Sequence, residues 1–241
     1  MSVLLLELSG PLQSWGDSSR YVRRGTRGEP TKSGIVGMLA SALGRSREDS
    51  LDDLASLEFG VRLDQPGSIL VDFQTERPQG DTKKAMPLSY RYYLSDAKFL
   101  VALAGDADWL KTICDAVSHP VWPLFLGRRS CPPDRPPALG VREEYADVRE
   151  ALSSEAWLAA ERYRRRNPRL RELEVACDAR EDEPAESQDD HPLSFSGACR
   201  RYAGRGVYRF RVGIEDLSDR DGDTRHQPGA KLPAHDPMGF F

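Results

Sequence analysis

A short segment with two hydroxyls and a lysine, Thr31-Lys32-Ser33, precedes an apolar stretch that runs from Gly34 to Gly44. Free backbone N–H groups at a helix start, together with an ammonium group and hydroxyls, can hold a phosphate. The phosphate loop of nucleotide hydrolases needs a glycine directly before the lysine, and Thr31 stands there instead. The segment therefore disfavours a nucleotide hydrolase. It leaves two interpretations open: a contact to one phosphate of a polyanion, or a capped helix with a solvated lysine.

Glycines, an aromatic ring and arginines come together after the first apolar run of the chain. The segment Gly10-Pro-Leu-Gln13-Ser-Trp15-Gly16 supplies a ring for stacking and an amide edge, and its glycines let the backbone approach a ligand closely. The arginines that follow are Arg20, Arg23, Arg24 and Arg27. Guanidinium groups beside a flat ring suit single-stranded RNA. An ordinary turn with a buried tryptophan is the alternative, and the neighbouring arginines favour RNA.

Two further basic segments have the composition of nucleic-acid contacts. Residues 76–90 lack a clear periodicity and lie between two predicted strands, so we expect a projecting loop or hairpin there. The candidate contacts on and just after it are Lys83, Lys84, Met86 and Arg91. Farther along, Gly127 precedes Arg128 and Arg129, and a glycine turn could present both guanidinium groups to a phosphate. For both segments an ordinary solvated loop is the alternative.

The sequence offers few groups for catalysis or metal binding. None of the four histidines (His119, His191, His226 and His235) adjoins the N-terminal basic region, where a metal-free ribonuclease would need a general base. The four cysteines form no CxxC pair, which favours reduced, packed thiols over a zinc site. Asp189-Asp190-His191 has no second group of metal-ligating residues to complete a metal site. The aspartates around Gly222 lack the closing glutamate of a calcium loop. We therefore predict no catalytic residue, no metal and no cofactor.

The charges are distributed unevenly along the chain. The formal net charge is −4, which by itself argues against nucleic acid. Residues 172–191, however, contain nine acids and one arginine, so the rest of the chain has a net charge of +4. Residues 1–47 hold seven basic and three acidic side chains, and residues 162–171 hold six arginines. Because the local field decides what binds, these numbers predict basic faces beside one acidic loop.

The acidic loop itself, at about 178–192, carries a prediction of its own. We expect it to be mobile and to face solvent or a basic partner, away from RNA. Its deletion would then leave RNA binding intact.

The predicted elements of the first 133 residues follow the order β-α-β-β-(projection)-β-α-β. The ranges are a strand at 2–8, helices at 34–44 and 50–57, strands at 59–63 and 68–75 joined as a hairpin, a strand at 98–104, a helix at 106–118 and a strand at 121–126. Apart from the projection, this is the order of a ferredoxin-like or RRM-type domain in an α+β protein.

Four prolines between Pro132 and Pro137 predict a domain boundary or a rigid turn. Beyond it we expect a helix at 153–166, strands at 173–177 and 206–214, and a polar tail from Asp216. The predicted domains are an RRM-like domain at 1–133, with its projection at about 76–95, and a smaller, mostly β domain at 134–241. The longest apolar run is far too short to cross a membrane and no signal peptide is visible, so we expect a cytoplasmic protein.

Four segments, taken in order, carry a family resemblance. They are GPLQSWG at 10–16, PTKSGIVGMLASALG at 30–44, YYLSDAKFLVAL at 92–103 and FLGRRSCPP at 125–133. Together they resemble the CasD family, the RAMP-superfamily subunits of type I-E CRISPR Cascade complexes, over roughly residues 3–133. The resemblance implies a modified RRM-like domain with a thumb hairpin, in a non-catalytic subunit that caps the 5′ handle of the CRISPR RNA. It also implies contacts to the Cascade backbone and large subunits, and to target DNA indirectly through the thumb.

The resemblance also suggests which residues contact RNA. The handle-gripping positions would be Gln13, Trp15, Arg27, Lys32, Ser33, Arg128 and Arg129, with Arg20 and Arg24 as further candidates, and Lys83, Lys84, Met86 and Arg91 would lie on the thumb. Two other functions stay open. One is a metal-independent endoribonuclease that processes CRISPR repeat RNA, as the related subunit of type I-C systems does, and the other is a protein-binding scaffold.

Overall fold

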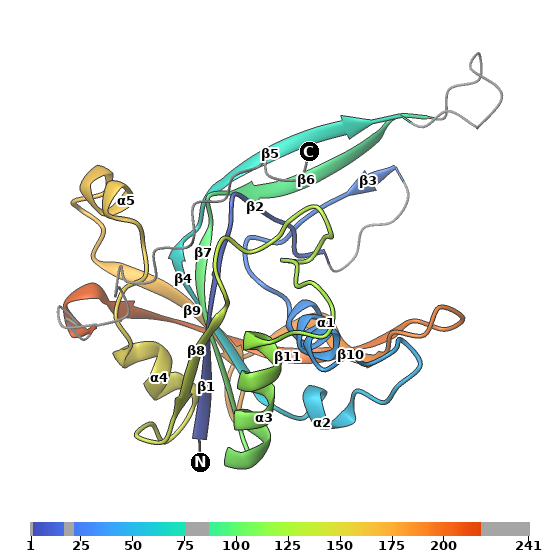
Figure 1. Ribbon diagram of the computed structural model, residues 1–241. Coiled ribbons are helices and arrows are strands. Elements are labelled where there is room, and N and C mark those ends of the chain that lie inside the picture. The colour runs from blue at the N-terminus through green and yellow to red at the C-terminus, as the bar shows by residue number, and fades with distance from the viewer. Residues whose placement is uncertain (1, 17–21, 76–86, 218–241) are drawn as a thin grey trace, which may run out of the picture.

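Two almost wholly apolar strands, β1 (Ser2–Ser9) and β7 (Lys98–Gly105), lie at the centre of the fold in the computed structural model (Figure 1). They pair antiparallel along their whole length. Both strands are buried on two faces, which explains why neither has the alternating pattern of a half-exposed strand. Their positions confirm the strands expected at 2–8 and 98–104. The structure describes residues 2–16, 22–75 and 87–217.

Five further strands extend this pair into a seven-stranded sheet in the order β10-β11-β9-β4-β7-β1-β8. The added strands are β4 (Glu58–Gln65), β8 (Ala138–Arg142), β9 (Glu172–Asp178), β10 (Glu186–Ser194) and β11 (Arg201–Gly213). The strands expected at 173–177 and 206–214 are confirmed as β9 and β11. Strands from both sides of residue 133 share this sheet, since β9 pairs with β4. The division into two domains stays a prediction.

Helices cover both faces of the sheet because successive side chains of each strand point to opposite faces. The helices are α1 (Lys32–Ala42), α2 (Asp52–Ala55), α3 (Ala107–Ser118), α4 (Val148–Ser154) and α5 (Glu161–Arg166), followed by the 3-10 helix η1 (Ile214–Asp216). α1 and α3 pack on the face that carries Leu4 and Leu6, and α4 packs on the face that carries Val3 and Leu5. The predicted mixed α+β fold is confirmed.

The two longest helices begin where the sequence predicts. Thr31 caps α1, because its hydroxyl accepts a hydrogen bond from the Gly34 N–H at 3.2 Å. Asp106 caps α3 in the same way, through two backbone N–H groups of the first turn. Leu110, Ile113 and Val117 of α3 are buried as expected, and Trp109 is partly buried. Among the described residues, no helix is long and apolar enough to cross a membrane.

A second, smaller sheet projects from the body of the molecule (Figure 1). It contains β2 (Leu12–Gln13), β3 (Arg23–Arg24), β5 (Ser68–Gln74) and β6 (Ser89–Ser95). β5 and β6 form its long antiparallel hairpin, in register from Ser68 opposite Ser95 to Gln74 opposite Ser89. The projection therefore begins at β5, earlier in the chain than the sequence predicts.

The predicted hairpin between 59–63 and 68–75 is wrong. β4 pairs with β7 and β9 in the large sheet, whereas β5 pairs with β6 in the small one. The chain crosses between the sheets at Gly67, whose φ of +74° suits glycine. A Cβ atom there would lie 2.4 Å from the Ser95 carbonyl oxygen, so glycine also permits the close approach.

Two other elements differ from the prediction for physical reasons. Residues 121–126 form no strand, because Pro120 and Pro123 lack N–H groups and Trp122 is 57% exposed; β8 supplies the strand after α3 instead. The helix expected at 153–166 is divided into α4 and α5. The buried Arg62 guanidinium binds the carbonyl oxygens of Leu152, Glu155 and Ala156, which ends α4.

Candidate nucleic-acid interface

Three segments that are distant in sequence lie side by side next to β6. The Arg27 N–H donates to the Trp15 carbonyl at 2.7 Å, and the Ser14 N–H donates to the Leu126 carbonyl at 3.1 Å. Gly127 then turns the chain with a φ of +85°. A Cβ atom on Gly127 would lie 1.8 Å from the Ser14 carbonyl oxygen, so this turn requires glycine. The glycine turn predicted before the arginine pair is therefore present.

The arginine pair after this turn reaches the N-terminal segment. One guanidinium N–H of Arg128 donates to the Arg24 carbonyl at 2.8 Å, and the same group lies 4.7 Å above the Tyr93 ring. Arg129 is exposed next to it. The structure thus brings together two groups of predicted RNA-binding residues that are about a hundred positions apart in the chain.

We call the surface around this junction the basic edge, made of Arg23, Arg24, Arg91, Arg128 and Arg129. β3 and β6 pair in parallel with Arg24 opposite Arg91, so two like charges are neighbours across these strands, while Asp72 of β5 lies opposite Arg91 on its other side. Among the described residues, no acceptor lies within hydrogen-bond distance of the buried Arg91 Nε or Arg128 Nη1. Buried donors of this kind normally have a partner. Within the described residues, two guanidinium nitrogens of the basic edge are therefore buried without an acceptor.

Aromatic rings accompany the basic edge. The Arg23 guanidinium lies 6.0 Å from the centre of the Tyr90 ring, and Tyr90 is half-buried. Tyr93, under Arg128, is only 4% exposed and is part of the core. Arg23 is among the arginines that the sequence associates with RNA, whereas Tyr90 is not among the predicted contact residues, although the tyrosine run that contains it is visible in the sequence. Only the pairing of β3 with β6 places them together.

Trp15 and Gln13 do not present surfaces to a ligand, which corrects their interpretation as stacking and base-edge groups. Trp15 is 1% exposed and Gln13 is fully buried. Gln13 Nε2 donates to the carbonyls of Leu8 and Ala97, and its Oε1 accepts from the Trp15 indole at 3.1 Å. The alternative interpretation, a turn with a buried tryptophan, is the correct one.

Lys32 and the start of α1 are likewise occupied from within the chain. The Lys32 ammonium binds Asp178 at 3.0 Å, and its backbone N–H donates to Asp190 at 2.7 Å. Lys32 is 5% exposed, so its interpretation as a solvent-facing phosphate contact is wrong. Ser33 is half-buried with its hydroxyl 3.4 Å from that of Thr31. The anion that the helix start attracts is a carboxylate of the protein itself.

The second part of the acidic stretch is a strand, which corrects its assignment as one loop, whereas most of residues 180–187 are exposed as expected. β10 begins at Glu186, and Asp190 within it is fully buried. Arg205 donates to Asp190 and to Asp178, and Asp178 also accepts from the Phe59 N–H. Deletion of 178–192 would therefore remove a strand and two internal carboxylates, so we no longer expect it to be harmless.

Several buried or half-buried arginines outside the basic edge are matched to carboxylates. The hydrogen bonds that Arg149 donates to Glu183 raise the pKa of Arg149, and those that Arg209 donates to Glu29 raise the pKa of Arg209. Arg205 is held between Asp178 and Asp190. The contrast with Arg24 and Arg91 indicates that the basic edge is not part of this internal charge pairing.

Several predicted residues cannot be placed at the interface in the same way. Arg20, Lys83, Lys84 and Met86 lie outside the described residues, as do His226 and His235. Arg27 is half-buried beside Trp15. His119 caps the end of α3, and His191 lies on β10, where burial lowers its pKa. Within the described part of the chain, no cluster of three metal-ligating side chains is present.

Comparisons with known proteins agree with one another. The family model described as "CRISPR-associated protein (Cas_Cas5)" matches residues 3–208. The chain is 35% identical over 170 residues to the CRISPR system Cascade subunit CasD of Escherichia coli (strain K12), covering 63% of this chain and 75% of the relative. A crystal structure of a Cas protein superposes with a TM-score of 0.71 at 38% identity, over 89% of this chain and 97% of that one. A chain of a CRISPR RNA-guided surveillance complex gives 0.72 at 34% identity, over 92% and 95%.

Proposed function

Because the chain belongs to the CRISPR-associated Cas5 family, we propose that it is a non-catalytic subunit of a Cascade surveillance complex and that its basic edge binds and caps the 5′ handle of the CRISPR RNA. The similarity to CasD and to a chain of an RNA-guided complex supports the assembly. The basic edge supports the RNA contact, since guanidinium groups bind phosphates through two parallel hydrogen bonds.

The observation that carries the RNA contact is the pair Arg24 and Arg91. The two side chains are neighbours across paired strands, and Arg91 Nε is buried without an acceptor among the described residues. A phosphodiester backbone supplies both the negative charge and the acceptor oxygens. Binding would thus remove a like-charge repulsion and satisfy a buried donor in one step.

The projecting hairpin supports the proposed protein partners. Ile69, Val71 and Phe73 alternate along β5, so they share one face, and they are 59%, 48% and 66% exposed. An apolar face of this kind is typical of an interaction surface. We assign it to contacts with the neighbouring backbone and large subunits, and we assign to the hairpin an indirect contact with target DNA.

The non-catalytic assignment rests on the positions of the two histidines that the structure describes. His119 lies at the end of α3, and His191 lies on β10 beside the internal pair of Lys32 and Asp190. Neither residue belongs to the basic edge, where a general base would have to reach the ribose hydroxyl. An endoribonuclease that processes repeat RNA remains the outcome that the experiment must separate from capping.

The test uses the full-length chain and labelled repeat RNA in EDTA, with binding and cleavage read from parallel gels. We expect intact RNA that is bound in a handle-dependent and salt-sensitive manner. Arg24→Glu with Arg91→Glu should weaken binding about 10- to 100-fold, because charge-assisted hydrogen bonds are lost. The matched control is Arg47→Glu with Arg200→Glu, two exposed arginines elsewhere on the surface. Unchanged binding by the first variant would refute the basic edge as the RNA site, and a discrete cut would make the chain a nuclease.

A further inference from the structure

α5 and the residues that follow it carry the densest positive charge of the described chain. Residues 161–171 contain six arginines and one glutamate. Figure 1 shows α5 on the opposite side of the molecule from β3, so this charge does not belong to the basic edge. None of the predicted handle or thumb contacts lies in this segment, and its charge therefore needs its own explanation.

The segment before α5 is fixed to β4 by buried polar groups. Arg62 is fully buried and pairs with Asp64 at 2.6 Å. Asp64 accepts hydrogen bonds from the Leu158 N–H at 2.6 Å and, through its carbonyl, from the Trp157 indole at 2.9 Å. Gln65 accepts from the N–H of Ala160, the residue before α5. Three positions of one core strand thus fix the place where the arginine helix starts.

One arginine of the cluster has a structural role. The Arg164 guanidinium lies 4.8 Å from the Trp157 ring and donates to the carbonyls of Trp157 and Ala159. The Tyr163 ring lies edge-on to the Trp157 ring, with 6.5 Å between the ring centres. The short helix is therefore held in one orientation, and its remaining arginines project from a fixed base.

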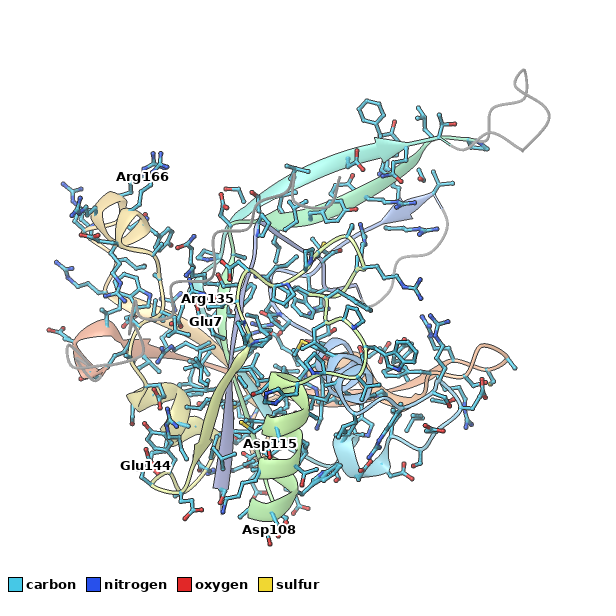
Figure 2. All side chains as sticks on the ribbon, viewed as in Figure 1. Glu7, Asp108, Asp115, Arg135, Glu144 and Arg166 are labelled. Atoms are coloured by element: carbon cyan, nitrogen blue, oxygen red, sulfur yellow. The ribbon has the colours of Figure 1, made fainter. Side chains whose placement is uncertain are left out.

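The other arginines have few partners. Arg165 pairs with Glu161, and both are more than three-quarters exposed. Within the part of the chain that the structure describes, no carboxylate forms an ion pair with Arg162, Arg166 or Arg169. Figure 2 shows Arg166 at the outer end of α5, pointing away from the body of the molecule. A fixed group of unpaired guanidinium groups is suited to a polyanion.

A polar cleft of about 640 Å³ adjoins these arginines. Arg162 and Arg166, one helical turn apart, line it together with Ser68, Ser95 and Lys98, which pairs with Glu7. Two carboxylates also line the cleft: Asp134, which accepts from the Ser9 hydroxyl and pairs with Arg135, and the exposed Asp96. Guanidinium groups and hydroxyls in one cleft match the contacts that proteins make to a sugar–phosphate backbone.

We propose that α5 and this cleft form a second nucleic-acid site, which binds the phosphodiester backbone of a strand other than the one held at the basic edge. The ligand is duplex DNA or RNA, since both present the same phosphates. A protein partner fits less well, because the interior of a protein interface needs apolar anchors, and none of the exposed large apolar residues of the described chain lies in 155–171.

The test compares two triple charge reversals of the full-length chain by fluorescence anisotropy. The first is Arg162→Glu, Arg166→Glu and Arg169→Glu, which spares the structural Arg164. The control is Arg47→Glu, Arg200→Glu and Arg201→Glu, which changes the net charge equally at exposed positions away from α5. The probes are a labelled 30-base-pair DNA duplex and the labelled repeat RNA, each titrated at several salt concentrations. Thermal unfolding of each variant checks that the fold is intact.

We expect the α5 variant to bind at least one probe about 10- to 100-fold more weakly than the control does. The slope of the logarithm of the association constant against the logarithm of the salt concentration should become shallower because three phosphate contacts are lost. The expected change is about 2.7 for the duplex, or about 2.1 for single-stranded RNA. The probe that is affected identifies the ligand. Equal binding of both probes by the α5 variant and the control would overturn the proposal, as would a wild-type chain that binds neither probe.

The basic-edge variant is measured in the same titrations so that the two proposals can fail separately. If Arg24→Glu with Arg91→Glu binds RNA normally while the α5 variant does not, the handle proposal fails and the α5 site stands. The reverse result leaves the basic edge as the nucleic-acid site and rejects α5.

Discussion

At the scale of single residues, Asp190 shows how the chain uses its own charges. Its carboxylate is fully buried and accepts hydrogen bonds from the Lys32 N–H, the Arg205 guanidinium and the Gln188 amide. It thereby occupies the start of α1, the position that the Thr31-Lys32-Ser33 sequence offers to a phosphate. The neighbouring Asp189 is exposed. Two adjacent aspartates therefore have opposite roles, because successive side chains of β10 point to opposite faces of the sheet.

Asp190→Asn should lower the free energy of unfolding by about 3 kcal/mol, because Arg205 and the start of α1 lose a buried charge partner. This value is at the lower end for such a loss, since Asp178 still faces Arg205. Urea denaturation at pH 7 measures the change. Asp189→Asn is the matched control and should change the stability by less than about 0.5 kcal/mol. Equal midpoints for the two variants would contradict the internal role of Asp190.

At the scale of elements, the contact between α4 and β4 is unusually close. Gly60 lies on β4 below the buried Val148 and Leu152 of α4. A Cβ atom at Gly60 would lie 2.5 Å from a Val148 methyl and 2.7 Å from a Leu152 methyl. A side chain of any size would push α4 away from the sheet. Since Arg62 also fixes the end of α4, the helix has little room to adjust.

Gly60→Ala should destabilise the protein by about 1–3 kcal/mol through overpacking. Thermal unfolding followed by circular dichroism measures the effect. Gly197→Ala is the control, because nothing lies within 4 Å of a Cβ atom there. That variant should be unchanged or slightly more stable, as its unfolded chain loses conformational freedom. A Gly60→Ala protein as stable as the control would show that α4 can move away from β4.

At the scale of the whole molecule, ion pairs connect the early and late parts of the chain. Lys32 binds Asp178 and Glu29 binds Arg209, while Arg149 binds Glu183 within the later part. The sequence segregates these charges into basic and acidic segments, and the fold brings many of them together. Among the described residues, two separate surfaces, the basic edge and α5, each hold several arginines without an ion pair. A protein with a negative net charge can therefore still present two sites for nucleic acid.

Acid should weaken these connections. Hydrogen bonds from Arg149 lower the pKa of Glu183 from its ordinary value of 4.5 to about 2. Since the native pKa lies below the unfolded one, the stabilisation is present above about pH 4.5 and is lost as the pH falls toward 2. The thermal midpoint of the wild type should thus fall more between pH 7 and pH 3 than that of Glu183→Gln. Glu181→Gln, at an exposed neighbouring position, should behave as the wild type does. Identical pH profiles for Glu183→Gln and the wild type would refute this assignment.

The sequence by itself determined the elements whose signals are local. The apolar runs of β1 and β7, the capping groups Thr31 and Asp106, and the glycine turn at Gly127 all act within a few residues. The same local motifs, read in order, were enough to indicate the family. They also named Arg24, Arg91, Arg128 and Arg129 as candidate contacts, but the strand pairing and the Arg128 hydrogen bond that bring these arginines together are visible only in the fold.

Only the tertiary structure decided which polar and aromatic side chains are available to a ligand. Trp15 and Lys32 have the chemistry of nucleic-acid contacts. Trp15, however, is buried in the core, and Lys32 is paired with Asp178, 146 positions away. The acidic stretch likewise became a strand because Arg205 and the start of α1 need its carboxylates. Residue type fixes what a group can bind. Whether that group is free to bind a ligand depends on partners that the fold brings together from distant parts of the chain, and a local sequence pattern does not contain this information.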